Sequence, residues 1–278
     1  MGAPWSRDPR TSTLALYPLM KSNVWTSAVT KDLVALGADQ KVVVIRDWET
    51  TSLGNSTPGG LNTSRSSQTL WTGSDVFSIT IEPQKKQNVI YAGCRNGSVK
   101  IFDLNQPGTY SSGPDPKEHL PFMREKRAKS ILEGIGHRES SVQSMRRVGE
   151  HYLITGATNG EISMWDKRFV GGVGCFGAGS QSRGGDRLTK SVLDFRGKVQ
   201  DQFSKVRLDI NVGETLLAAD NLGHRVSLWS IKTGERLKDL EVKGPAVSSL
   251  KFSPDQQGIW VAVGDRVQFW GLGASNVD

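Results

Sequence analysis

The sequence predicts an all-β protein built from repeated antiparallel sheets, and three observations lead to this fold class. A strand-turn-strand pattern recurs along the chain, each copy contains the alternation of apolar and polar residues that is typical of half-buried strands, and most copies close on an aromatic residue. The longest apolar run covers residues 42–45, whereas a membrane-spanning helix needs about 20 such residues. We therefore expect no membrane segment and no membrane partner.

The clearest repeat begins with a strand-length run at 141–145 and continues with a second run at 152–157. The turn residues Asn159 and Gly160 follow, and an alternating strand then ends at Trp165. An Asn-Gly pair is typical of a two-residue type I′ hairpin turn, which needs positive φ at both central positions. We therefore expect a hairpin with a type I′ turn at this point.

Four imperfect copies of the same order are visible elsewhere, at 24–47, 76–103, 205–230 and 247–270. We expect the aromatic residue near the end of each third strand to pack between neighbouring sheets. His137 precedes the clearest copy and is expected to order a turn through hydrogen bonds. The positions to which we assign structural roles in the repeats are His137, Asn159, Gly160, Asn96, Gly97, Phe102, Asp103, Trp229 and Trp270.

A fourth short run usually follows each copy, and four antiparallel strands per repeat form the blade of a β-propeller. Three polar or Gly-rich insertions, at 49–67, 105–128 and 169–189, separate third from fourth strands. Without them the repeat averages about 43 residues, within the roughly 40–45 of a WD repeat. The sequence thus predicts a WD40-type β-propeller with five visible blades and its three insertions on one face.

We assign residues 24–272 to the propeller, 1–23 to an N-terminal segment and 273–278 to a C-terminal tail. WD propellers mostly have seven blades, so the five copies leave two alternatives. Leu14–Tyr17 could supply the outer strand that closes a ring of five, or two blades could lie in N-terminal sequence outside this chain. We favour the second alternative, an incomplete seven-bladed propeller with an open arc.

Charge and cysteine content narrow the cellular context. The net charge is +7, and basic residues crowd the stretches 117–129 and 183–207, which permits nucleic acid or an acidic protein as partner. The two cysteines, Cys94 and Cys175, are far apart in sequence and form no disulfide framework. We expect an intracellular protein, nuclear or cytoplasmic.

The sequence favours no catalytic activity. Residues 172–177 match the G-x-G-x-x-G dinucleotide pattern, but the Gly- and Ser-rich residues that follow cannot open the helix that the pattern requires. The four histidines share no metal-ligand spacing, and neither a P-loop nor a nucleophile elbow is present. We expect a protein that is not an enzyme and that binds neither cofactor nor metal.

Residues 153–168 resemble the sixteen-residue box, ending in Trp-Asp-x-Arg, of WD-repeat substrate receptors that dock onto the adaptor of cullin-4 RING ubiquitin ligases. The seventh position of the box, usually acidic, is Asn159 here. Over about residues 24–272 the chain is similar, at modest identity, to the cullin-4-associated factor four family. The segments that carry this wider resemblance are Asp75-Val76, Gly93-Cys94-Arg95, Asn96-Gly97 and 261–265.

The resemblance implies a non-catalytic receptor that docks on the cullin-4 ligase adaptor through Trp165, Asp166 and Arg168 and presents unidentified substrates for ubiquitination. Arg168 should emerge where the third strand leaves its sheet, with a guanidinium suited to charge-assisted hydrogen bonds. The plainer interpretation is a surface pair between Arg168 and Asp166. The alternative function is a general scaffold in an RNA-processing or chromatin complex, whose basic stretches contact nucleic acid.

Overall fold

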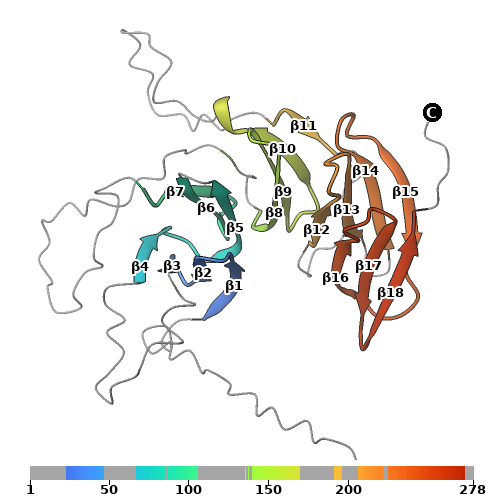
Figure 1. Cartoon of the computed structure of the whole chain (residues 1–278), viewed down its shortest axis with the longest axis horizontal. Coiled ribbons are helices and arrows are strands. Elements are labelled where there is room, and N and C mark those ends of the chain that lie inside the picture. The colour runs from blue at the N-terminus through green and yellow to red at the C-terminus, as the bar shows by residue number, and fades with distance from the viewer. Residues whose placement is uncertain are drawn as a thin grey trace, which may run out of the picture.

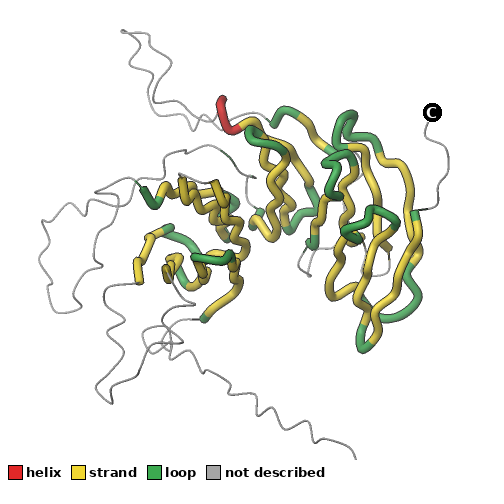
Figure 2. The backbone as a smooth tube through the Cα atoms, viewed as in Figure 1, coloured by secondary structure: helices red, strands yellow, loops and turns green. Residues whose placement is uncertain are grey.

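The structure, a computed structural model, describes residues 23–46, 67–84, 87–105, 135, 137, 140–169, 191–195, 206–221 and 225–272. This described part is all-β. It consists of five antiparallel sheets of three or four strands and a single turn of 3-10 helix, η3 (Lys167–Phe169). Figure 2 shows that strands make up most of the described backbone.

Each sheet is formed by strands that are consecutive in sequence. Sheet one comprises β1 (Val24–Val29), β2 (Leu33–Ala38), β3 (Lys41–Arg46) and β4 (Ser67–Trp71), and sheet two comprises β5 (Val76–Gln84), β6 (Gln87–Cys94) and β7 (Val99–Asp103). Sheet three comprises β8 (Val142–Val148), β9 (Tyr152–Ala157), β10 (Ile162–Asp166) and β11 (Leu193–Asp194). Sheet four comprises β12 (Leu208–Ile210), β13 (Leu216–Asn221), β14 (Arg225–Ser230) and β15 (Arg236–Glu241), and sheet five comprises β16 (Val247–Phe252), β17 (Gly258–Val263) and β18 (Arg266–Gly271).

The five sheets stand side by side along an arc (Figure 1). The first strand of each sheet lies on the concave side, where β1 contacts β5, β5 contacts β8, β8 contacts β12 and β12 contacts β16. Sheets one and five lie at opposite ends, so the described sheets form an open arc and no closed ring. The strand considered for closing a ring of five, Leu14–Tyr17, lies outside the described residues.

The described residues form four hydrophobic clusters, one for each contact between neighbouring sheets. Buried residues of sheet one, such as Val42 and Val44, pack with Ile90 and Phe102 of sheet two. Between sheets two and three, Tyr91 and Ile101 pack against Leu153 and Trp165. Between sheets three and four, Ile154 packs with Leu217 and Trp229. Between sheets four and five, Ala218 and Leu228 pack against Phe252 and Ile259. Because sheets two, three and four each bury both faces in this way, stacking supplies the main apolar burial of the described fold.

The aromatic residues near the ends of the third strands all face the preceding sheet. Phe102, Trp165 and Trp229 are at most 5% exposed and belong to the clusters shared with sheets one, two and three. Trp270 packs against the cluster shared with sheet four but is only half-buried. These large side chains fill the space between neighbouring sheets.

The hairpin turns differ from the expected type I′. Gly97 and Gly160 have positive φ of 83° and 79°, but Asn96 and Asn159 do not. The Gly160 N–H donates to the Ala157 carbonyl, and Gly97 makes the same bond to Cys94. This pattern is that of a type I turn followed by a left-handed glycine, so the type I′ prediction is wrong.

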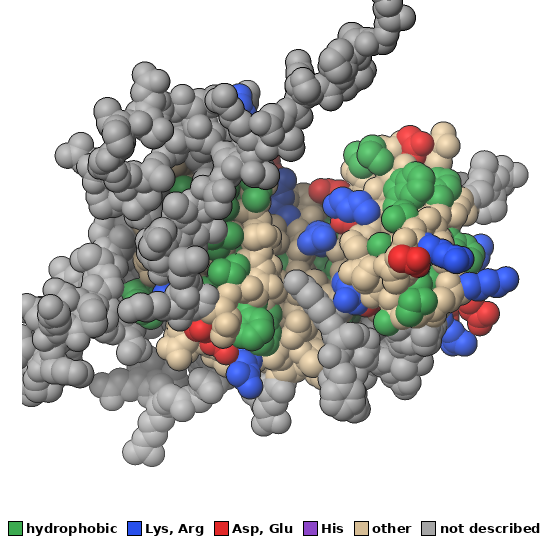
Figure 3. Space-filling view, turned by 90° about the horizontal axis from the view of Figure 1, so that it is seen from below, with side chains coloured by type: hydrophobic (Ala, Val, Ile, Leu, Met, Phe, Trp, Pro, Cys, Tyr) green, Lys and Arg blue, Asp and Glu red, His purple; other side chains and the backbone are tan. Residues whose placement is uncertain are grey.

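Ion pairs tie the inner strands together. The buried carboxylate of Asp209 on β12 accepts hydrogen bonds from Arg146 on β8 (3.2 Å), from Lys251 on β16 (3.0 Å) and from the backbone N–H of Phe252 (2.8 Å). One side chain of sheet four therefore joins sheets three and five. Figure 3 looks into the concave side of the arc and shows Lys and Arg side chains in the hollow between its two halves.

The described strands run from β1, which begins at Val24, to β18, which ends at Gly271. β4 includes Ser67, which had been assigned to the first insertion. Almost all of the insertions 49–67, 105–128 and 169–189, together with residues 1–22 and 273–278, lie outside the described residues.

No described helix has the length and apolar character needed to cross a membrane. No described group of three or more His, Cys, Asp or Glu side chains could hold a metal ion.

Candidate functional site

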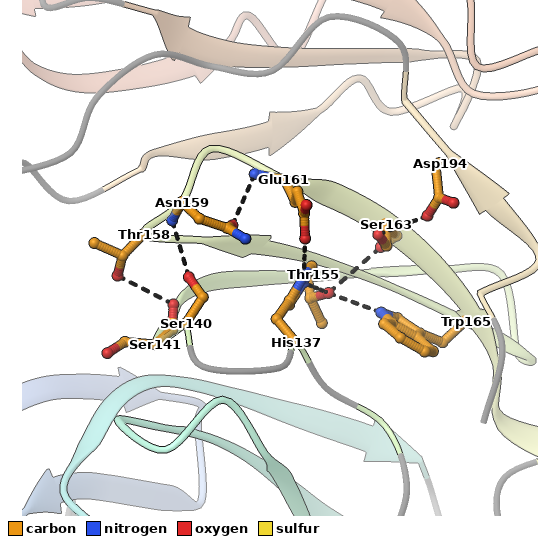
Figure 4. A network of polar contacts seen from close by, with 10 residues as sticks. All are labelled: His137, Ser140, Ser141, Thr155, Thr158, Asn159, Glu161, Ser163, Trp165 and Asp194. Carbon is orange, nitrogen blue, oxygen red and sulfur yellow. Dashed lines mark hydrogen bonds and ion pairs between the residues drawn. The ribbon is translucent and has the colours of Figure 1, made fainter. Parts of the chain in front are cut away.

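The candidate site is the end of β10 with the turn of 3-10 helix that follows it. Trp165 anchors this segment, since its indole N–H donates to the Thr155 hydroxyl on the neighbouring strand at 2.8 Å. Nε2 of His137 lies 2.9 Å from the same hydroxyl, and its ring meets Trp165 edge-on at 5.9 Å between centroids. Figure 4 shows the three side chains converging beneath the Asn159 turn.

Neighbouring polar residues extend this cluster towards the turn and towards the outer strand. Glu161 lies 3.6 Å from Nδ1 of His137, and Ser163 donates to Asp194 on β11 at 2.7 Å (Figure 4). Burial lowers the pKa of His137 below its ordinary value, although Glu161 acts in the opposite direction. The cluster therefore fixes β10 through a buried, largely neutral histidine.

Asp166 and Arg168 form a two-pronged pair directly after Trp165. Nε and Nη2 of Arg168 donate to the two carboxylate oxygens of Asp166 at 3.0 and 2.6 Å, and the Arg168 backbone N–H donates at 2.9 Å. The Asp166 side chain is 5% exposed, whereas that of Arg168 is 51% exposed. The buried carboxylate thus holds a half-exposed guanidinium at the surface.

The protonation states of this pair follow from the contact. The hydrogen bond from Arg168 lowers the pKa of Asp166, and the same bond raises the pKa of Arg168. Both groups are therefore charged at neutral pH. Because Arg168 presents planar N–H donors in a fixed orientation, the segment can bind carbonyl or carboxylate oxygens of another molecule.

Lys167 fastens the same segment to sheet two. Its ammonium donates to Glu82 on β5 at 3.1 Å and to the Tyr91 hydroxyl on β6 at 3.0 Å, and it lies 5.2 Å from the centre of the Tyr91 ring. Arg147 on β8 donates to the other oxygen of Glu82 at 3.1 Å, and the Tyr91 hydroxyl also donates to Glu82. We call Glu82, Tyr91, Arg147 and Lys167 the polar clamp.

Glu82 remains charged in the polar clamp despite its burial. Burial alone raises the pKa of a carboxyl group, but hydrogen bonds from Tyr91 and Lys167 bring the pKa of Glu82 below its ordinary value. Burial and the bond to Glu82 both raise the pKa of Tyr91, so its hydroxyl stays a donor. Lys167 and Arg147 supply the compensating positive charge.

The other predicted site residues belong to the turns and sheet contacts. Gly97 lies at the contact between sheets two and three. Its N–H donates to the Cys94 carbonyl, and its own carbonyl accepts a hydrogen bond from the His137 N–H. A Cβ at Gly97 would lie 1.9 Å from the His137 carbonyl oxygen, so no larger residue fits. Asp103 occupies the position in sheet two that Asp166 occupies in sheet three. Its carboxylate accepts a hydrogen bond from the Asn105 N–H at 2.8 Å.

The structure brings Trp165, Asp166 and Arg168 together with His137, Asn159 and Gly160 in sheet three, while Trp229 and Trp270 lie in other sheets. Sequence reasoning missed Thr155, which links His137 to Trp165, and it missed the polar clamp. Glu82 and Lys167 are 85 positions apart. Only the predicted stacking of repeats could have suggested that they meet.

Comparisons with known proteins identify a fold and no family. No family model and no curated protein matches the chain. Among solved structures, the computationally designed protein Ika8 is 14% identical, with a TM-score of 0.51, over 90% of this chain and 71% of that chain. The computationally designed protein Ika4 is 15% identical, with a TM-score of 0.46, over 72% of this chain and 92% of that chain. The likeness to Ika8 is one of fold alone.

Proposed function

We propose that the chain is part of a WD40-type β-propeller and acts as a non-catalytic substrate receptor. In this proposal it docks on the adaptor of a cullin-4 RING ubiquitin ligase, in the nucleus or the cytoplasm, and presents substrates for ubiquitination. The regular stacking of the five sheets supports the propeller part of the proposal. Sheets two to five each turn the aromatic residue of the third strand to the preceding sheet, as blades around one axis would.

One observation carries the docking part. At the end of the third strand of sheet three, the buried Asp166 orients the guanidinium of Arg168 at the surface. A side chain that is oriented before binding loses less conformational entropy when a partner arrives. Arginine is also among the residues most often found at energetic centres of protein interfaces.

The segment around Arg168 is fixed on two sides. The Trp165 indole is hydrogen-bonded inside sheet three, and the polar clamp holds Lys167 against sheet two. The equivalent segment of sheet two has Asp103 but Asn105 where sheet three has Arg168. We therefore assign the docking role to Trp165, Asp166 and Arg168 and not to the other sheets.

The experiment is a binding measurement between the purified chain and the ligase adaptor. We expect Arg168→Ala to weaken binding about 30-fold or more, since truncation of an arginine at an interface hot spot costs about 2 kcal/mol or more. The matched control is Arg225→Ala. Arg225 is 48% exposed and also pairs with an acidic residue, Glu241, but it lies at the opposite end of a third strand.

Equal binding by the wild-type chain and Arg168→Ala would remove Arg168 from the mechanism.

The alternative function, contact with nucleic acid, rests on the basic stretches 117–129 and 183–207. In the second stretch, Nη1 of Arg207 lies 2.8 Å from a carboxylate oxygen of the buried Asp220. Binding to RNA or DNA that weakens linearly with the logarithm of salt concentration would favour that alternative.

A further inference from the structure

The first strands of the five sheets line the concave side of the arc, and their charged side chains follow one pattern. Within the described residues these strands carry two acidic side chains, Glu82 and Asp209, and three basic ones, Arg146, Arg147 and Lys251. The acidic side chains are 5% and 4% exposed, whereas the basic ones are 39%, 33% and 69% exposed. The concave side therefore hides its negative charge and presents its positive charge to solvent. We call Arg146, Arg147 and Lys251 the inner cations.

Two of the inner cations converge on Asp209. Nε of Arg146 and the ammonium of Lys251 donate to the same carboxylate oxygen, at 3.2 and 3.0 Å, and the other oxygen accepts the backbone N–H of Phe252. Nη1 of Arg146 donates to the Met145 carbonyl, and Nη2 has no acceptor among the described residues. One negative charge thus meets two positive ones, and both cations keep N–H donors that another molecule can use.

Glu82 is shared between two cations in the same way. Arg147 and Lys167 each donate to it at 3.1 Å. Because Arg146 and Arg147 are consecutive on β8, they point to opposite neighbours of sheet three. Four cations and two carboxylates leave this row with a net charge of +2. Sheet three has a described sheet on each side (Figure 1), so the exposure of β8 does not depend on the ends of the arc.

The charged residues that adjoin these strands leave the excess in place. Arg207, directly before β12, is matched by the buried Asp220 at 2.8 Å. Glu214 follows β12 and accepts the Gly149 N–H at 2.7 Å, so its charge lies where β8 has already ended. Figure 3 shows Lys and Arg side chains gathered in the hollow on this side of the molecule. The hollow is therefore a positively charged recess.

We infer that the inner cations bind an acidic peptide segment of a partner protein through its Asp or Glu carboxylates. A recess lined by one sign of charge concentrates the opposite sign. Arginine side chains suit carboxylates, and those already held by a buried acid lose less conformational entropy on binding. A net charge of +2 matches a segment with two carboxylates, whereas nucleic acid presents a phosphate at every nucleotide. If the proposed function holds, on which this last step rests, the segment belongs to the substrate.

The binding is tested with a short fluorescein-labelled peptide of alternating Glu and Ser, whose anisotropy is measured with the purified 278-residue chain at low salt. We expect this peptide to bind and the matching peptide of Gln and Ser not to bind. A short single-stranded RNA is the competing probe. Equal binding of the two peptides would overturn the inference, and so would tighter binding of the RNA than of the Glu peptide.

Variants of the inner cations locate the binding. We expect Arg146→Gln and Lys251→Gln each to weaken binding of the Glu peptide about tenfold, because each removes a charge-assisted hydrogen bond. Arg146→Lys keeps the charge and should recover part of the affinity. The matched control is Arg225→Gln, which removes the same charge from an arginine that is 48% exposed and paired with Glu241 on a third strand. Equal weakening in this control would mean that only the overall charge matters, against the inference.

Folding and docking are separated from this readout. Circular dichroism shows whether each variant folds, and Lys251→Gln carries the test if Arg146→Gln does not, since the Lys251 side chain is 69% exposed. Wild-type affinity in folded Lys251→Gln would contradict the inference. The peptide is measured without the ligase adaptor, so a failure here leaves docking at Arg168 standing. Intact peptide binding with no adaptor binding would instead overturn the proposed function alone.

Discussion

The contacts between sheets two and three and between sheets four and five have the same geometry but different chemistry. The first contains the polar clamp, with the charged Glu82 held by Tyr91, Arg147 and Lys167. The second is filled mainly by aliphatic and aromatic side chains such as Phe252 and Ile259, and its ion pair, between Asp209 and Lys251, joins the first strands of the two sheets. Both also contain buried apolar residues, so the clamp is an addition to the common stacking.

This difference shows that the contact between sheets two and three orients particular side chains in addition to stabilising the fold. Apolar contacts are non-directional, whereas hydrogen bonds and ion pairs fix atoms in particular positions. Buried ion pairs also add little net stability, because the groups lose their hydration. The polar clamp lies next to Arg168, where orientation matters for the proposed docking, and the apolar contact lies away from it.

The largest effect is expected at the apolar contact. Phe252 is 4% exposed between sheets four and five. Phe252→Ala should lower the free energy of unfolding by about 3–5 kcal/mol, because the lost apolar burial leaves a cavity. Chemical denaturation monitored by circular dichroism measures this change. A loss below about 1 kcal/mol would mean that the contact is not the stabilising one.

A smaller loss of stability is expected at the polar clamp, together with a change in pH dependence. Glu82→Gln should cost about 1–3 kcal/mol at neutral pH, because two cations lose their partner. The folded pKa of Glu82 lies below its unfolded value of 4.5, so its contribution is complete above pH 4.5 and is lost as pH falls through the folded pKa. Denaturation between neutral and acid pH should show that Glu82→Gln loses less stability on acidification than the wild-type chain.

Adaptor binding by the same variants sharpens the comparison. If the polar clamp orients the Arg168 segment, Glu82→Gln weakens adaptor binding while Phe252→Ala, measured where it is still folded, leaves it unchanged. The reverse order would contradict the division between the two contacts.

The smallest effect is expected on the outer strand β15. Leu237→Ser replaces a side chain that is 57% exposed and should change the free energy of unfolding by no more than about 0.5 kcal/mol. The same denaturation assay provides the reference for the two variants above. A larger loss would show that the outer strand contributes to a contact that the described residues do not reveal.

Local sequence patterns were enough to predict the sheets. The alternation in β10 and β14 and the glycines in the turns are read from neighbouring residues, and each repeat pairs only with itself. The turn type was not predictable in this way. Asn-Gly favours type I′ in a two-residue loop, but here the glycine alone takes positive φ, and at Gly97 the nearby His137 carbonyl excludes any Cβ.

The candidate site was predictable only in part. Trp165, Asp166 and Arg168 are close in sequence, so their proximity required only the end of a strand. Thr155 gave no signal, because a hydroxyl in a strand is common and its partners come from two other segments. Glu82 and Lys167 meet only after separate repeats stack, and the register of that stacking is a property of the packed sheets.

The carboxylate of Asp209 joins three sheets. From its position in sheet four, this carboxylate binds Arg146 of sheet three and Lys251 of sheet five. If sheet four detaches, two cations and one backbone N–H therefore lose their hydrogen-bond acceptor at once. The C-terminal half of the arc should consequently melt as one cooperative unit, so that amide protons in all three sheets become exchangeable together.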